Sequence, residues 1–186
     1  MAAADQLDFF SAPAEVYYDV ETQLSADEVG GWGNIHLMRV SVAITWSPGD
    51  LFRRWDEPQM PEMIAYLSGF RKIISFNGDG FDSRVLSAYG DVSAINRNSF
   101  DLLTDLKKKL GRRLKLDSLA QGTLGEGKTA DGMAALRWWK EGKVDQIAAY
   151  CQQDVKVLVD LVAFARAKGY VSYPDFHQIK NVAVQW

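Results

Sequence analysis

The sequence predicts an α/β domain in which a mixed β-sheet is flanked by helices. Three observations lead to this prediction: strand-like runs gather early in the chain, one helical segment separates two of them, and the pattern from residue 100 onward is mostly helical. The chain has 186 residues, of which 47% are hydrophobic and 24% are charged. This balance fits a single soluble globular domain of ordinary size.

Four runs rich in β-branched and aromatic residues are expected to form strands. Turn-forming residues follow the second and the fourth run, at 47–50 and 77–80. The fourth run is compact and apolar, which indicates a buried strand. The four predicted strands are residues 16–21, 35–46, 51–55 and 72–76.

Six segments are predicted to be helical, and glycines separate the later ones. Residues 1–14 are small, polar and aperiodic, so we expect a flexible lead-in. Residues 15–167 are expected to form the domain, and residues 168–186 a C-terminal extension that packs on it and ends in a strand-like run, 182–186. The predicted helices are residues 59–69, 81–89, 101–110, 115–121, 131–141 and 144–167.

Hydropathy and cysteine content argue against membrane and secreted classes. No apolar stretch approaches the ~18 residues that cross a bilayer, and the first residues lack the basic start and apolar core of a signal peptide. Cys151 is the only cysteine, so no internal disulfide can form. We therefore expect a cytoplasmic protein without membrane association.

The charge distribution is uneven. The net charge is -3, but residues 107–115 hold six basic side chains and no acid. The remainder carries 15 basic and 24 acidic residues. An acidic body with one basic cluster suits a metal-binding nuclease, and it also suits a protein with one solvated basic turn.

The first predicted strand places two carboxylates on one face. Because side chains alternate along a strand, Tyr17, Asp19 and Glu21 share a face. Two carboxylates this close repel each other unless a cation lies between them. Taken alone, the pair is more simply explained as a strand end with solvated acids.

The helix predicted over 144–167 carries an aspartate on its apolar stripe, which comprises Ile147, Tyr150, Cys151, Leu158 and Leu161. Asp154 falls in the middle of this stripe, where a lone carboxylate must lose its charge or find a partner. Tyr150 lies one turn earlier and projects beside it. Two interpretations stay open: a buried aspartate satisfied by a hydroxyl or an amide, and a metal ligand.

Asp82 adds a fourth acid, at the start of a helix that follows a strand and a glycine turn. Such an acid is usually a helix cap. With Asp19, Glu21 and Asp154 it nevertheless gives four acids at strand ends and on helix faces. Hard cations such as Mg²⁺ and Mn²⁺ take carboxylate oxygens, and a pair of such ions can drive phosphodiester hydrolysis.

Three short motifs, in this order, resemble those of the DEDD-superfamily 3′–5′ exonucleases, which have an RNase H-like fold. They are Asp19-Val20-Glu21, Phe76-Asn77-Gly78-x-x-Phe81-Asp82 and Tyr150-Cys151-x-x-Asp154. The last spacing matches the tyrosine subclass, because the histidine subclass would have histidine where Ala149 stands. The residues of the second and third motifs resemble those of the proofreading domain of family-B DNA polymerases. Residues 131–139 also resemble bacterial RNase H-like exonuclease domains found alone or beside helicases.

The resemblance implies a metal-dependent 3′–5′ exonuclease that releases nucleoside monophosphates from DNA or RNA, preferably single-stranded. Asp19, Glu21 and Asp154 would hold the catalytic Mg²⁺ or Mn²⁺ ion, Asp82 would serve a second ion, and Tyr150 would orient the attacking water. The implied partners are nucleic acid and a helicase or another nucleic-acid-processing protein. The alternatives are an endonuclease on the same fold and a catalytically weak module for nucleic-acid binding or assembly.

Several residues outside the acids are candidates for substrate contacts. Trp32, in a glycine-rich loop, could stack against a terminal base, and Asn77 could bond a phosphate or a sugar. In the basic run, Lys108, Arg112 and Lys115 would lie along one face of a helix, although Gly111 interrupts that helix.

A rival motif lies at residues 122–129, which fit the Gly-x4-Gly-Lys-Thr pattern of a phosphate-binding loop. That loop needs a strand before it, whereas residues 114–121 look helical, so we interpret the match as accidental. Lys128 stays a candidate phosphate contact as a surface lysine.

Overall fold

A five-stranded mixed sheet forms the centre of the computed structural model, which describes residues 14–126 and 132–186. The strand order is β3-β2-β1-β4-β5, with β1 antiparallel to β2, β2 antiparallel to β3, and β4 parallel to both β1 and β5. The strands are β1 (Glu15–Thr22), β2 (Val40–Ser47), β3 (Leu51–Asp56), β4 (Lys72–Ser75) and β5 (Ser99–Asp101). The predicted α/β class is confirmed.

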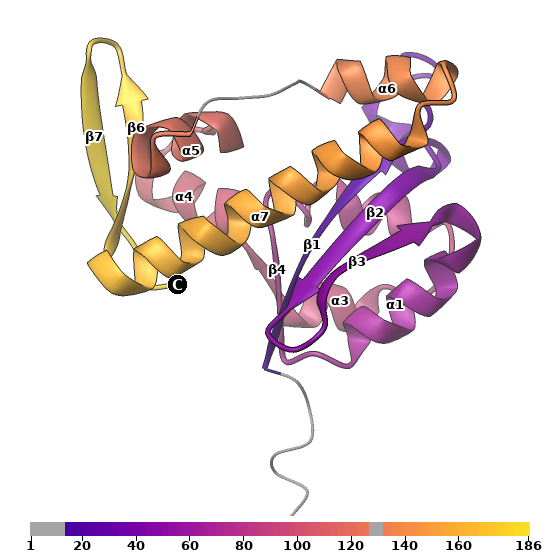
Figure 1. Ribbon diagram of the computed structural model, residues 1–186, viewed down its shortest axis with the longest axis horizontal. Helices are drawn as coiled ribbons and strands as arrows, with labels where there is room; N and C mark the ends of the chain where they lie inside the picture. The colour runs from indigo at the N-terminus through magenta and orange to yellow at the C-terminus, as the bar shows by residue number, and fades with distance from the viewer. Residues whose placement is uncertain (1–13, 127–131) are drawn as a thin grey trace, which may run out of the picture.

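Helices cover both faces of the sheet (Figure 1). One face packs on α1 (Met60–Ser68), α2 (Asp82–Leu86) and α3 (Ser93–Asn98). The other packs on α4 (Leu102–Leu110), α5 (Leu116–Leu124), α6 (Gly132–Lys140) and α7 (Val144–Lys168). Two short 3₁₀ helices, η2 (Trp32–Leu37) and η3 (Glu57–Gln59), lie in the connections.

Strand alternation separates the two cores. Val16, Tyr18 and Val20 of β1 are buried with α1, α2 and α3, whereas Tyr17 is buried on the side of α7. The face that Tyr17 shares with Asp19 and Glu21 therefore faces α7, as the alternation predicts.

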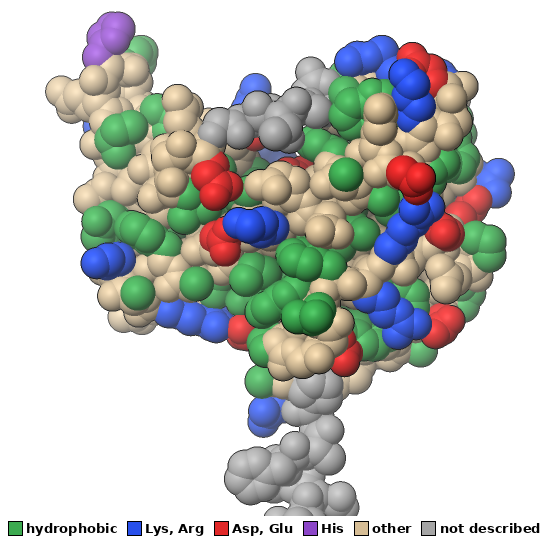
Figure 2. All heavy atoms as spheres, in the orientation of Figure 1, with side chains coloured by type: hydrophobic (Ala, Val, Ile, Leu, Met, Phe, Trp, Pro, Cys, Tyr) green, Lys and Arg blue, Asp and Glu red, His purple; other side chains and the backbone are tan. Residues whose placement is uncertain are grey.

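The long helix α7 crosses the sheet diagonally and contacts β1 and β2 (Figure 1). Its stripe Ile147, Cys151, Val155 and Leu158 is fully or almost fully buried. Acidic and basic side chains are interspersed on the outer face of the molecule seen in Figure 2, where no large patch of one sign forms.

A hairpin follows α7. Its strands β6 (Tyr170–Asp175) and β7 (Gln178–Ala183) form a separate two-stranded sheet that lies against α5. Val171 and Tyr173 are buried in the same core as α7. The strand-like run expected over 182–186 has other bounds: β7 begins at Gln178 and ends at Ala183. The unpredicted strand β6 pairs with it, because the turn at Phe176, which has a φ of 54°, folds residues 170–183 into a hairpin.

Two other predicted elements were too long. The strand expected over 35–46 begins only at Val40, because Ile35 and Met38 are buried at the end of η2 and Arg39 has a φ of 57°. The helix expected over 81–89 ends at Leu86, and α3 follows separately. In the part of the chain that the structure describes, no helix is long and apolar enough to cross a membrane.

Gly122 lets α5 approach the hairpin closely. A Cβ atom at this position would lie 2.6 Å from the Ser172 carbonyl oxygen and from Tyr173 Cα. Gly122→Ala should therefore lower the free energy of unfolding by about 1–3 kcal/mol, even though alanine favours helix. Urea unfolding measures this change. The exposed neighbour Gln121 provides the control, since Gln121→Ala should stay within about 0.5 kcal/mol of wild type; equal effects of the two variants would contradict the close packing.

Candidate nuclease site

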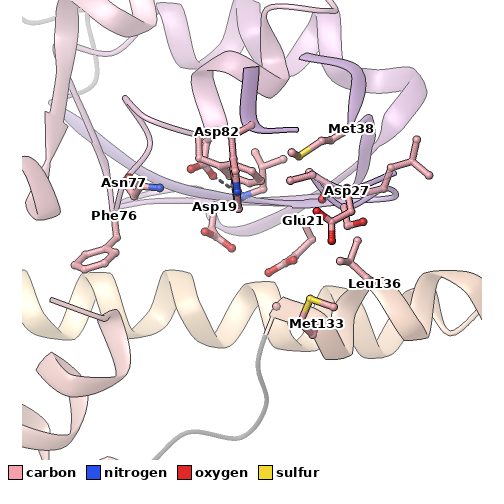
Figure 3. Close-up of a pocket in the computed structure, with 17 residues that line it drawn as sticks. Asp19, Glu21, Asp27, Met38, Phe76, Asn77, Asp82, Met133 and Leu136 are labelled. Carbon is pink, nitrogen blue, oxygen red and sulfur yellow. Dashed lines mark hydrogen bonds between the residues drawn. The ribbon is translucent and has the colours of Figure 1, made fainter. Parts of the chain in front are cut away.

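Asp19 and Glu21 lie where β1 extends beyond its neighbour β4. Pairing between the two strands ends at Tyr17 and Ile74, so the following residues of β1 have an open edge on that side. Figure 3 shows Asp19 and Glu21 directed towards the long helix. Pairing with β2 continues through this region and holds the backbone of both residues in register.

Asp154 of α7 meets these two carboxylates. One side-chain oxygen from each of Asp19, Glu21 and Asp154 lies within 4.8 Å of the other two. All three side chains are partly exposed, so solvent and ligands can reach them. The predicted convergence of a strand face and a helix stripe is thus present.

Asp82 lies at the start of α2 and is 3% exposed. Its Oδ1 accepts a hydrogen bond of 2.9 Å from the Val20 amide, on the edge of β1 that β4 leaves open. Asp82 lines the same pocket as Asp19, although it is not one of the three converging acids. The fourth acid therefore shares a pocket with Asp19 and Glu21, and it is also a structural acceptor for β1.

Burial and like charge raise the pKa of two acids in this site. For Asp19 the main cause is burial, followed by the negative charge of Asp82. For Asp82 burial again comes first, and the charge of Asp101 raises its pKa further. Such shifts are expected where carboxylates gather away from water without a cation.

Tyr150 lies one turn before Asp154 on α7 and packs edge-on against Trp138 of α6, with ring centroids 6.2 Å apart. Burial raises the pKa of its hydroxyl well above the ordinary range, and the charges of Asp154, Glu21 and Asp19 raise it further. The phenol is therefore protonated at neutral pH and can donate a hydrogen bond.

Cys151 of α7 contacts the Asp19 carboxylate. Its Sγ lies 3.3 Å from Asp19 Oδ2 and donates a hydrogen bond to it. Burial, and then the Asp19 charge, raise the pKa of this thiol well above its usual value. This buried thiol helps to orient the Asp19 carboxylate. The position of Cys151 on the apolar stripe does not indicate this contact.

Asp101 shapes the turn that carries the second motif. It caps α4 by accepting from the Leu103 and Thr104 amides, and it also accepts from the Asn77 amide at 2.8 Å. Asn77 adopts a left-handed conformation with a φ of 69°. A single carboxylate, 6% exposed, thereby joins the start of α4 to the turn after β4.

One pocket at the site has a volume of about 640 Å³ and is lined by Asp19, Glu21 and Asp82. Apolar side chains line it as well: Trp32 and Phe81, whose rings lie 6.4 Å apart, and Met133 and Leu136 of α6, which Figure 3 shows beside Glu21. We call it the apolar pocket. Lys140 of α6 bonds Glu28 at 2.7 Å and so joins the helix to the segment 24–27 that forms a further wall.

The second pocket, of about 550 Å³, shares Asp19, Phe76 and Asn77 with the first. Tyr150 and Asp154 line it together with Arg113 and Lys115 from the connection between α4 and α5. We call it the cationic groove after these two basic residues, although Asp19, Asp117 and Asp154 also line it. The two hollows therefore meet at Asp19 and Asn77, beside the converging acids.

The predicted substrate contacts divide into two groups. Trp32, Asn77 and Lys115 line the pockets. Lys108 and Arg112 line neither: α4 ends at Leu110, and Arg112 bonds Asp175 of the hairpin at 2.9 Å. The prediction of one basic row was wrong because Gly111, with a φ of 70°, turns the chain after the helix.

The rival phosphate-loop motif begins inside a helix. Gly122, Thr123 and Leu124 belong to α5, and Gly125 ends it, so these residues form a helix C-terminus rather than a loop after a strand. Lys128 lies outside the described residues.

Several further residues lie at the site without having been predicted from the sequence. Asp101 carries no motif, and only its position before an apolar helix indicates a cap. Arg113 belonged to the noticed basic run, but its direction depends on the turn at Gly111. Asp27, Met133 and Leu136 also line the apolar pocket, and no sequence signal singles them out.

Comparison with known proteins supports a nuclease fold. No curated protein matches the sequence significantly. The structure is similar to that of the family B DNA polymerase from the hyperthermophilic archaeon Pyrobaculum calidifontis, with a TM-score of 0.60 and 15% identity. The similarity covers 81% of this chain and 24% of the polymerase, so the chain spans about a quarter of that protein. The family model of the RNase H superfamily matches residues 16–165, and the chain therefore belongs to the RNase H superfamily.

Proposed function

We propose that this protein is a metal-dependent 3′–5′ exonuclease acting on single-stranded nucleic acid. The observation that carries the proposal is the convergence of Asp19, Glu21 and Asp154, with Tyr150 beside them, at the junction of an apolar pocket and a cationic groove. A base fits the first hollow and a phosphate backbone the second. The superfamily supports nuclease activity, and the order of the motifs supports the exonuclease class.

The acids fit a divalent cation. The site offers only oxygen ligands, from Asp19, Glu21 and Asp154, and Mg²⁺ and Mn²⁺ prefer oxygen ligands. A bound cation would also neutralise negative charge where the three carboxylates lie close together. A second ion would be served by Asp82 and Asp19. Bound in this place, such cations supply a nucleophilic hydroxide at neutral pH and stabilise the departing oxygen.

The remaining side chains position the reactants. Tyr150 keeps its proton and can hold a water molecule in line with a phosphorus atom through a hydrogen bond. Cys151 and the Val20 amide fix the carboxylates of Asp19 and Asp82. Trp32 and Phe81 offer aromatic faces and edges on which an unpaired base can stack.

The resemblance of the three motifs to those of 3′–5′ exonucleases favours an exonuclease over an endonuclease. The apolar pocket beside the acids offers room for the base of a terminal nucleotide. A helicase partner stays a prediction from the motif resemblance.

Digestion of 5′-labelled single strands with Mg²⁺ tests this function. We expect a ladder that shortens from the 3′ end, released nucleoside monophosphates, and no cleavage of a circular single strand. Cleavage of the circle would instead indicate an endonuclease. Binding without any cleavage, with either Mg²⁺ or Mn²⁺, would indicate a binding module.

The metal ligands are tested by Asp19→Asn and Asp154→Asn. Each substitution should reduce the rate by at least about 10³-fold, because an oxygen ligand and a charge are lost. Each should also abolish the rise in melting temperature that Mn²⁺ gives the wild-type protein. The exposed acid Asp145, on the same helix, provides the control, since Asp145→Asn should keep both properties. Full Mn²⁺ stabilisation in both site variants would refute the assignment.

Tyr150→Phe removes the hydroxyl and keeps the ring that packs on Trp138. Since the phenol positions water rather than neutralising charge, we expect a rate loss of roughly 10- to 1,000-fold with unchanged Mn²⁺ binding. Single-turnover rates and calorimetry measure the two quantities. A wild-type rate would reduce Tyr150 to a packing role.

The raised pKa values of Asp19 and Asp82 predict how stability depends on pH in metal-free buffer. The unfolded chain ionises these groups near pH 4, while the folded protein holds the protons to higher pH. Folding therefore takes up protons, and the free energy of unfolding falls as pH rises above about 4, until both groups are ionised.

Asp82→Asn removes one of the two charges and keeps an oxygen to accept from Val20. Urea unfolding in EDTA should show this variant gaining stability relative to wild type as pH rises from about 4. A stability difference that is constant across the pH series would contradict the repulsion between the two carboxylates.

A further inference from the structure

Two of the cations around Arg113 are paired with acids, whereas Arg113 is directed to the site. Arg112 pairs with Asp175 of the hairpin, and Lys109 lies 3.7 Å from Asp105 one turn earlier in its helix. Arg113 lines the cationic groove instead, and its Nη2 donates a hydrogen bond of 2.9 Å to Asn77 Oδ1. Among the described residues, no carboxylate forms an ion pair with its guanidinium.

The partner of Arg113 is held rigidly. The backbone N–H of Asn77 donates a hydrogen bond to the Asp101 carboxylate, which also caps α4. The turn after β4 and the start of α4 are thereby joined. Because Arg113 occupies the Asn77 side-chain oxygen, the side-chain NH₂ group is left as a donor. Asn77 lines both hollows and thus stands at the boundary between them.

Acidic and basic side chains both line the groove. Its acids are Asp19, Asp117 and Asp154, and a polyanion that passes them gains from basic contacts nearby. Arg113 and Lys115 are the basic side chains that line it as well, from the loop that follows α4. An arginine fork binds two phosphate oxygens at once, while a lysine offers a point charge.

We propose that Arg113, with Lys115 beside it, binds the phosphodiester group next to the one that is cut, on the side away from the apolar pocket. The inference rests on the proposed function, because it takes single-stranded nucleic acid as the ligand. The terminal nucleotide lies in the apolar pocket, the scissile phosphate lies at Asp19 and Asn77, and the backbone continues over Arg113. The remaining basic residues of the run 107–115 lie outside this path.

Fluorescence anisotropy with a short single strand measures the contact. The cation is Ca²⁺, and a gel afterwards verifies that the strand is intact. Arg113→Gln should weaken binding roughly 10- to 100-fold, the usual range for charged hydrogen bonds, and lower the salt slope by about 0.7. Arg113→Lys should restore the slope but only part of the affinity.

Lys108→Gln is the matched control, because it removes one exposed cation of the same run outside both pockets. We expect less than about a twofold change in affinity. Equal losses in Lys108→Gln and Arg113→Gln would mean that overall charge, and not the groove, determines binding, and this would overturn the inference.

A scan with single methylphosphonate linkages locates the phosphate. In the wild type, the uncharged linkage next to the scissile one should weaken binding most. In Arg113→Gln the uncharged linkage at the same place should not lower the affinity further. Uncharged linkages elsewhere should lower the affinity of both proteins equally. Identical scan profiles for the two proteins would overturn the inference.

The Mg²⁺ digestion separates this inference from the proposed function. A wild type that binds with the expected scan profile but leaves the strand intact contradicts only the exonuclease. A wild type that shortens the strand, with no Arg113 effect on binding, contradicts only the phosphate site.

Discussion

The packing of α7 across β1 and β2 builds the core and the site together. Ile147, Cys151, Val155 and Leu158 are buried against the sheet, and this contact fixes the helix over the strand. Asp154 lies on the same helix and Asp19 on the strand below it. The apolar packing therefore forces like charges together, and the favourable burial of the stripe offsets their repulsion.

Neighbouring groups reduce part of that repulsion. The Cys151 thiol and the Val20 amide each donate to a carboxylate, and both come from elements that the core already holds in place. Burial, and then neighbouring negative charge, keep the pKa values of Asp19 and Asp82 raised in spite of these hydrogen bonds. A divalent cation bound at this site would reduce the repulsion between the carboxylates. Because the core holds the ligands in place, they need little reorganisation when a cation binds.

The features that the sequence predicts correctly are those that depend on local periodicity. The alternation along β1 gave the correct face for Asp19 and Glu21, and the helical stripe gave the correct place for Asp154. The position of Arg113 and the hairpin after α7 depend on turns at Gly111 and Phe176, both with positive φ. Gly111 indicates a break in the helix, but the direction of the chain after each turn depends on contacts between distant segments, such as the pair Arg112–Asp175, which no sequence window contains.

In the proposed function, Asp19, Glu21 and Asp154 bind a divalent cation between β1 and α7. Anomalous diffraction from crystals soaked in Mn²⁺ can locate this cation. The expected result is a peak in contact with carboxylate oxygens of both Asp19 and Asp154, which disappears in crystals of Asp19→Asn. A Mn²⁺ peak bound elsewhere, with none at Asp19 in crystals whose site is open to solvent, would contradict this assignment.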